Sequence, residues 1–226
     1  MPLTLPLFEP YIIGEDMAKI TALALPRLES MGWHHPTDPD TLPSIQGIDF
    51  PRGRISEIAG PPSSGRTSLL DSLLATATLR SEHCVLIDTR DSFDPPSAAA
   101  YGVRLEKLIW IRCRGNAEHA LRAADLVLHS GGFGVIALDL ADVSPSALNR
   151  IPPTAWFRFR RIVEPTPTIF VVLANRPITK SCSTLLIETR RRSAKFLRGV
   201  EYEIASRKPA GKEAVKFHVR LHSLAG

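Results

Sequence analysis

The stretch that decides the fold is Gly60-Pro61-Pro62-Ser63-Ser64-Gly65-Arg66-Thr67-Ser68. It differs at one residue from the phosphate-loop pattern G-x-x-x-x-G-K-[ST]. An alternating run over residues 54–59 comes before it and predicts a short strand, and an apolar repeat over residues 69–74 comes after it and predicts a helix. The stretch therefore lies between a strand and a helix, which is the context that a phosphate-binding loop needs.

The composition of the stretch suits a polyphosphate. Its two glycines let the backbone curl so that successive N–H groups point inward, and the N-terminus of the following helix adds positive dipole. We expect the phosphates to contact Gly60, Pro61, Ser63, Ser64, Gly65, Arg66, Thr67 and Ser68. Thr67 is placed to offer its hydroxyl to Mg²⁺. The alternative is a Gly- and Ser-rich turn before a helix, without a ligand.

Arg66 stands where the pattern has lysine. Its guanidinium is still cationic, so attraction for phosphate can survive. The planar fork is wider than an ammonium and its donors are fixed in direction. We therefore expect the geometry at the γ-phosphate to be unfavourable for catalysis.

Composition places the chain among ordinary globular proteins. Of its 226 residues 44% are apolar and 23% are charged, and no apolar run is long enough to span a membrane. The first ten residues do not resemble a signal peptide, and Cys84, Cys113 and Cys182 have neither disulfide nor zinc spacing. These features predict a cytoplasmic location.

The charge is divided unevenly along the chain. Residues 1–149 contain 12 Lys and Arg against 18 Asp and Glu, whereas residues 150–226 contain 16 against 5. An acidic body with a basic C-terminal third indicates an anionic partner for that third. A solvated basic face would explain the charge equally well.

The order of the apolar runs predicts an α/β fold with a mainly parallel sheet. Strands are expected at 84–88, 108–111, 135–139 and 168–174, helices at 116–129 and 154–164, and loops at 32–43 and 144–153. Alternation over 199–206 and 216–223 predicts a C-terminal antiparallel hairpin. We divide the chain into an N-terminal helical and extended segment, 1–43, and a core, 44–226.

Asp139 ends one of the buried strands and is the expected second part of the nucleotide site. In phosphate-loop proteins such an Asp helps to hold Mg²⁺ beside the Ser or Thr of the loop. Thr67 and Asp139 are therefore the candidate metal ligands. A helix N-cap or a strand-end carboxylate without a ligand is the alternative.

The basic third mixes arginines with aromatic residues in a way that suits single-stranded DNA. Trp156 and Phe159 are three residues apart on a predicted helix, so we expect their shared face to lie in the core. The arginines are then the better candidates for phosphate contact. The predicted DNA-binding residues are Arg158, Arg160, Arg161, Arg190, Arg191, Arg192, Lys195, Lys208 and Lys212.

With these elements in order, residues 42–223 resemble the RecA family of recombinases. The similarity rests on the segment from Gly53 through the phosphate loop, on Leu86-Ile87-Asp88 followed by Asp94-Pro95, and on Tyr101-Gly102-Val103. The pattern continues in register to Val135-Ile136. The resemblance implies a RecA-type fold that binds ATP with Mg²⁺, and it places Asp94 near the adenine.

The departures from the family concern the chemistry. The family's catalytic Glu corresponds to Arg90, with Asp91 adjacent but out of register. Its γ-phosphate-sensing Gln corresponds to Arg176, next to Asn175, and an aromatic residue near the adenine corresponds to Ser97. We therefore expect weak or no ATP hydrolysis.

A shortened RecA core with an altered ATP site resembles the ImuA group, RecA-like accessories of bacterial mutagenic translesion synthesis. This resemblance implies a role in the DNA damage (SOS) response and an ImuB-like polymerase homologue as partner, besides single-stranded DNA, RecA and further copies of the chain. Three alternatives remain: a working DNA-stimulated ATPase that uses another carboxylate such as Asp91, a SulA-like inhibitor of cell division, and a small-molecule kinase. The match to the RecA core argues against the kinase.

Overall fold

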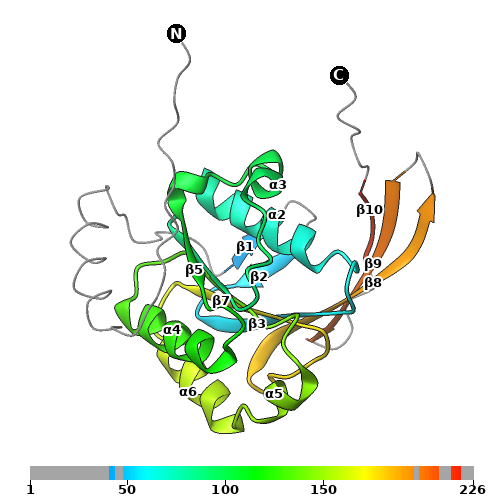
Figure 1. Ribbon diagram of the computed structural model, residues 1–226. Coiled ribbons are helices and arrows are strands. Elements are labelled where there is room, and N and C mark those ends of the chain that lie inside the picture. The colour runs from blue at the N-terminus through cyan, green and yellow to red at the C-terminus, as the bar shows by residue number, and fades with distance from the viewer. Residues whose placement is uncertain (1–40, 44–47, 196–198, 209–214, 220–226) are drawn as a thin grey trace.

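The computed structural model describes residues 41–43, 48–195, 199–208 and 215–219 (Figure 1). Their strands are β1 (Thr41–Pro43), β2 (Asp49–Pro51), β3 (Arg54–Ala59), β4 (Cys84–Asp88), β5 (Leu108–Arg112), β6 (Val135–Asp139), β7 (Ile169–Ala174), β8 (Ser183–Lys195), β9 (Gly199–Lys208) and β10 (Val215–Val219). Their helices are α2 (Arg66–Leu79), α3 (Pro95–Ala100), η1 (Leu105–Lys107), α4 (Ala117–Ser130), α5 (Pro145–Asn149) and α6 (Pro153–Val163). The predicted N-terminal segment lies outside these residues except for β1.

The main sheet has the strand order β10-β9-β8-β3-β7-β6-β4-β5. The six strands from β8 to β5 are parallel, and β9 and β10 extend the sheet antiparallel from β8. β1 and β2 form a separate antiparallel pair. The predicted mainly parallel sheet with a C-terminal antiparallel hairpin is confirmed.

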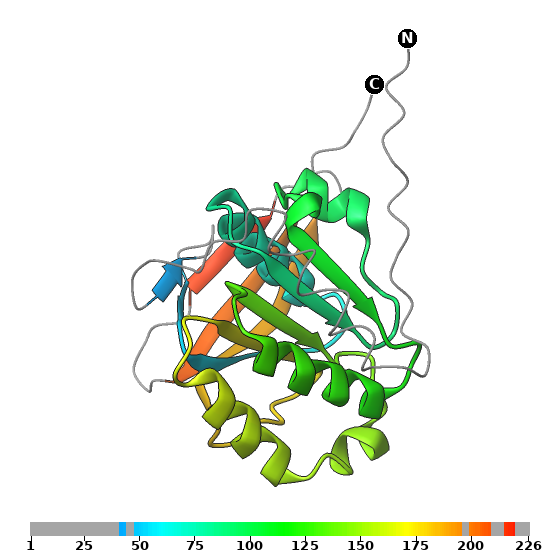
Figure 2. The ribbon, with the colours of Figure 1, turned by 90° about the vertical axis from the view of Figure 1, so that its left-hand side faces the viewer.

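Helices cover both faces of the sheet (Figures 1 and 2). Successive strand residues point to opposite sides, so apolar residues on both sides need a covering layer. In β6, Ile136 and Leu138 pack in a cluster with α4 and α6, whereas Val135 and Ala137 pack in a second cluster with α2. Both sides of these strands are therefore buried, which explains their near-continuous apolar sequences. No helix in the described part of the chain is long and apolar enough to cross a membrane.

Among the elements that were not predicted from the sequence are β1, β8 and α5. β1 lies in an expected loop, where Leu42 is fully buried, and β8 occupies a stretch that the sequence marked only as a basic cluster. α5 also lies in an expected loop. A helix forms there because the Ser144 hydroxyl accepts a hydrogen bond from the Ala147 N–H and because Pro145 suits the first turn. Residues 220–223 of the predicted hairpin lie outside the described residues.

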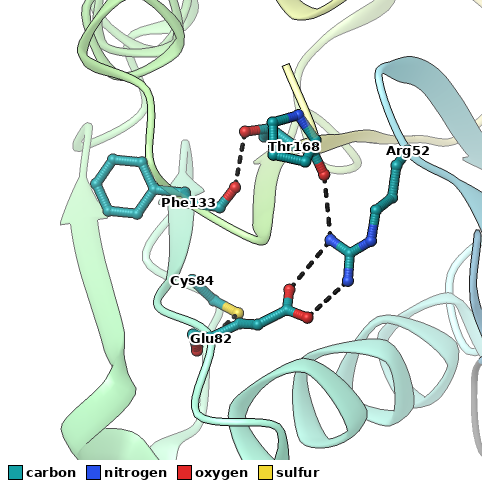
Figure 3. A network of polar contacts seen from close by, with 6 residues as sticks. Arg52, Glu82, Cys84, Phe133 and Thr168 are labelled. Atoms are coloured by element: carbon teal, nitrogen blue, oxygen red, sulfur yellow. Dashed lines mark hydrogen bonds and ion pairs between the residues drawn. The ribbon is translucent and has the colours of Figure 1, made fainter. Parts of the chain in front are cut away.

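A buried ion pair closes the amino-terminal edge of the sheet (Figure 3). Arg52 holds Glu82 through both guanidinium nitrogens, at 2.6 and 3.2 Å, and also donates to the carbonyl oxygen of Pro167 at 3.1 Å. A side chain at Gly134 would overlap Glu82, so a glycine is required there. Thr168 donates to the carbonyl oxygen of Phe133 at 2.7 Å. These contacts join the segments before β3, β4, β6 and β7.

Candidate nucleotide site and basic surfaces

The carboxyl ends of the central strands are level with one another, at the edge opposite the Arg52–Glu82 ion pair. Ala59 at the end of β3 pairs with Ala174 of β7, and Asp139 of β6 pairs with Leu173. Asp88 of β4 pairs in turn with Asp139. The sheet therefore brings the phosphate loop and two strand-end aspartates to the same edge, where ligands bind in open α/β sheets.

The loop between β3 and α2 has the curled backbone that a phosphate site needs. The Gly60 N–H donates to the Ala174 carbonyl at 3.1 Å, which holds the start of the loop on β7. Ser63 and Gly65 have φ angles of 57° and 91°, in the left-handed region that favours glycine. α2 begins directly after Gly65, so its first unpaired N–H groups face the loop.

β8 packs directly on this loop. The hydroxyls of Ser64 and Thr189 are buried and lie 2.6 Å apart. A side chain at Gly60 would overlap both the hydroxyl and the carbonyl oxygen of Thr189. Sequence reasoning missed Thr189, and no local pattern could have revealed it, because the contact arises from the pairing of β3 with β8.

The Arg66 side chain is bound into the loop. Its Nη1 donates to the Gly60 carbonyl at 2.7 Å and to Oδ1 of Asn175, the residue that follows β7. Only 8% of Arg66 is exposed. Burial lowers the pKa of Arg66, whereas the negative charges of Asp139 and Asp142 raise it. The cation that should meet phosphate therefore already contacts the loop and Asn175, and it lies under the electrostatic influence of Asp139 and Asp142.

The predicted metal ligands flank this arginine. Thr67 lies exposed in the first turn of α2, and Asp139 accepts a hydrogen bond from the Ala141 N–H at 2.8 Å. Burial raises the pKa of Asp139 to about 6; the Ala141 N–H and Arg66 oppose the rise, and Asp88 and Asp142 add to it. A metal ion would therefore need to displace a proton from Asp139 below about pH 6. Among the described residues, no three His, Cys, Asp or Glu form a preformed metal site.

The position expected for a water-activating carboxylate holds Arg90, which is exposed. Its neighbour Asp91 forms an ion pair with Arg112 at 2.9 Å, and the Arg112 guanidinium lies over the Trp110 ring at 4.9 Å from the centroid. Asp88 accepts hydrogen bonds from the backbone N–H groups of Arg90 and Phe93 and from Trp110 Nε1. Both carboxylates nearest to Arg90 thus have structural partners.

Asp94 is the N-cap of α3, and it accepts a hydrogen bond from the Ser97 N–H at 3.0 Å. The structure adds a carboxylate that the sequence did not single out, Asp71 in α2. Asp71 is 4% exposed, and its Oδ1 has no hydrogen-bond partner among the described residues. Burial, followed by the charge of Asp94, raises the pKa of Asp71 to about 7.

The predicted DNA-binding residues fall into two separate groups. Arg158, Arg160 and Arg161 lie on α6, whereas Arg190 and Arg191 lie exposed on the distal part of β8. Figure 1 shows α6 below the sheet and the distal part of β8 at its right-hand side. Arg192, Lys195 and Lys208 belong to β8 and β9, and Lys212 lies outside the described residues.

The α6 helix confirms one prediction about this surface. Trp156 and Phe159 are both buried, as expected from their spacing, and they pack edge to face with centroids 6.0 Å apart. Arg158 reaches to α4, where it forms an ion pair with Asp125 at 2.9 Å. Phe157 is 49% exposed and is not among the predicted DNA-binding residues.

Part of the chain is similar in sequence to known proteins. Residues 38–149 match the RecA N-terminal domain. The chain is 42% identical over 100 residues to RecA of Rickettsia massiliae, covering 44% of this chain and 28% of that protein. It is 32% identical over 152 residues to RecA of Corynebacterium jeikeium, covering 59% of this chain and 40% of that protein.

A solved structure extends the similarity to the fold of most of the chain. The flagellar accessory protein FlaH of Methanocaldococcus jannaschii superposes with a TM-score of 0.55 at 15% identity, covering 81% of this chain and 96% of FlaH. This likeness and the strand order give the chain a RecA-type phosphate-loop fold. It spans less than half the length of the curated RecA proteins that it matches.

Proposed function

We propose that this protein is a RecA-like accessory of DNA repair that binds single-stranded DNA and nucleotide but hydrolyses ATP weakly or not at all. The observation that carries the proposal is the position of Arg66. Its guanidinium is hydrogen-bonded to the Gly60 carbonyl and Asn175. In that position it stabilises the loop itself and is unavailable to a γ-phosphate.

The loop backbone supports binding of a nucleotide. Its curled segment and the N-terminus of α2 fit a polyphosphate, and Thr67 and Asp139 would hold Mg²⁺. Asp94 is proposed to lie near the base. Hydrolysis needs a group that orients or deprotonates water, and such help contributes about 10²–10⁴ in rate. Arg90 cannot accept a proton, and Asp91 is held by Arg112.

The finer proposal is membership of the ImuA group of translesion-synthesis accessories. It is supported by a RecA-like domain with Arg66 and Arg90 at two catalytic positions, followed by a basic C-terminal third. In this proposal the protein acts in the SOS response in the cytoplasm. Its partners are an ImuB-like polymerase homologue, RecA and further copies of the chain.

The nucleotide part is tested by equilibrium titration with Mg-ATP and by a hydrolysis assay with and without single-stranded DNA. We expect binding that raises the melting temperature by mass action, with little turnover. Turnover of about 1 s⁻¹ or more, abolished by Asp139→Ala, would show a working ATPase instead. No melting shift at millimolar nucleotide would show that the loop does not bind it.

The DNA part is tested by the salt dependence of oligonucleotide binding. Each phosphate that an arginine neutralises releases counterions, so affinity should fall steeply with salt. The double variant Arg190→Ala/Arg191→Ala should bind more weakly and with a flatter salt slope. A matched control is Arg122→Ala, which removes an exposed arginine of α4 that forms an ion pair with Glu118. No binding by the wild type at about 50 mM salt would favour a purely protein-directed role, such as a SulA-like inhibitor.

A further inference from the structure

The orientation of α6 is fixed by its apolar residues. Trp156, Phe159 and Val163 are buried against the sheet, and Phe159 also packs edge to face on Phe170 of β7, with centroids 5.5 Å apart. The helix therefore cannot rotate without losing this packing. The opposite face of α6 is held toward solvent.

That outward face combines one aromatic residue with two arginines. Phe157 is 49% exposed, and Arg160 and Arg161 follow it at i+3 and i+4, so the three side chains share one side of the helix. Among the described residues, Phe157 is the only aromatic one of the exposed large apolar side chains. We call Phe157, Arg160 and Arg161 the outer α6 face.

The neighbouring charges do not neutralise this face. Arg158 is engaged with Asp125 of α4 at 2.9 Å, and the acidic Glu164 at the end of α6 is engaged with Arg54 of β3 at 2.8 Å. The side chains of Arg160 and Arg161 form no ion pair or hydrogen bond with a described residue. The outer α6 face therefore presents two uncompensated cations beside an exposed ring.

We propose that the outer α6 face binds single-stranded nucleic acid, with an unpaired base stacked on Phe157 and the flanking phosphates held by Arg160 and Arg161. This rests on the proposed DNA-binding function and adds the base-stacking residue. An exposed aromatic ring beside arginines is the combination that binds single strands without sequence preference. The base is accessible to a ring only when it is unpaired, so the face distinguishes single strands from duplexes. Its helix, α6, lies apart from the distal part of β8 (Figure 1), the strand that contains Arg190 and Arg191, so the protein would have two contact points for one nucleic-acid strand.

The test compares oligo(dT) with an abasic oligomer of the same length, each bound to the full chain and followed by fluorescence anisotropy. Phe157→Ala should weaken oligo(dT) binding roughly 5- to 150-fold, the range of one base stack, and leave abasic binding unchanged. Phe157→Trp should retain oligo(dT) binding. Arg160→Ala/Arg161→Ala should weaken binding of both oligomers. Leu126→Ala, at an exposed apolar residue of α4, is the matched control and should change neither.

The outcomes separate this inference from the function on which it rests. If Arg190→Ala/Arg191→Ala weakens binding while Phe157→Ala and the Arg160/Arg161 variant do not, DNA binding stands and the outer α6 face is excluded. If Phe157→Ala weakens both oligomers equally, or Phe157→Trp fails to restore binding in a folded protein, stacking is excluded. If the wild type binds neither oligomer at about 50 mM salt, both proposals fall. If Phe157→Ala leaves the binding of both oligomers unchanged but abolishes the binding of an acidic peptide, the face binds protein and the inference is wrong.

Discussion

Replacing Asp71 by asparagine should stabilise the protein in a pH-dependent manner. Asp71 lies in the helix after the phosphate loop, is 4% exposed, and has an Oδ1 without a partner among the described residues. Burial, followed by the charge of Asp94, raises its pKa from 3.8 to about 7. The folded state therefore holds the proton more tightly than the unfolded chain.

The sign and size of the effect follow from linkage. Between about pH 4 and pH 7 the folded state binds more protons at Asp71 than the unfolded state, so the free energy of unfolding falls as pH rises. A shift of about three pKa units corresponds to a loss on the order of 4 kcal/mol that is complete above pH 7. Asparagine has the same shape and cannot ionise. We expect the free energy of unfolding of Asp71→Asn to exceed that of the wild type by about 2–4 kcal/mol at pH 8. At pH 4.5 the two should differ by less than about 1 kcal/mol.

The assay is urea unfolding followed by circular dichroism at both pH values. Other groups titrate in this range, including Asp139, so the quantity to compare is the difference between variant and wild type. Asp94→Asn is the control and should have a smaller effect, because Asp94 is exposed and is only the second cause of the shift. A variant no more stable than the wild type at pH 8, or equally more stable at both pH values, would refute the reasoning.

Three further predictions concern the loop and the opposite edge of the sheet. Arg66→Lys should lose a hydrogen bond from a charged group, which lowers the free energy of unfolding in urea by about 1.5–3 kcal/mol. Its affinity for Mg-ATP in calorimetric titration should rise. Unchanged affinity would show that the arginine does not limit binding. Gly60→Ala should lower the free energy of unfolding by about 1–3 kcal/mol, because its methyl group overlaps Thr189; a wild-type melting curve would contradict this contact. Glu82→Gln should lower the free energy of unfolding by about 3–5 kcal/mol at neutral pH, because it leaves Arg52 buried without its carboxylate. A loss below about 1 kcal/mol would mean that the pair is solvated.

The sequence by itself determined the central α/β unit. The strands at 54–59, 84–88 and 135–139 were predicted with the bounds that the structure has, because their apolar residues are contiguous and turn residues surround them. The phosphate loop was recognisable because its glycines and hydroxyls are adjacent in sequence. The inward face of α6 followed from the three-residue spacing of Trp156 and Phe159. These are local patterns, and local patterns can be read along the chain.

Only the tertiary structure decided what the side chains at the site contact. Arg66 meets Asn175, and Ser64 meets Thr189, across more than a hundred residues of sequence, and no spacing predicts either pair. β8 was missed because its basic residues carry no strand signal, and it forms by pairing with β3 and β9. Asp71 occupies a helix position that could equally face solvent, and only the packing around α2 buries it. Burial and partner choice depend on how the strands and helices assemble, which is why the sequence could propose candidate site residues but could not give their contacts or electrostatics.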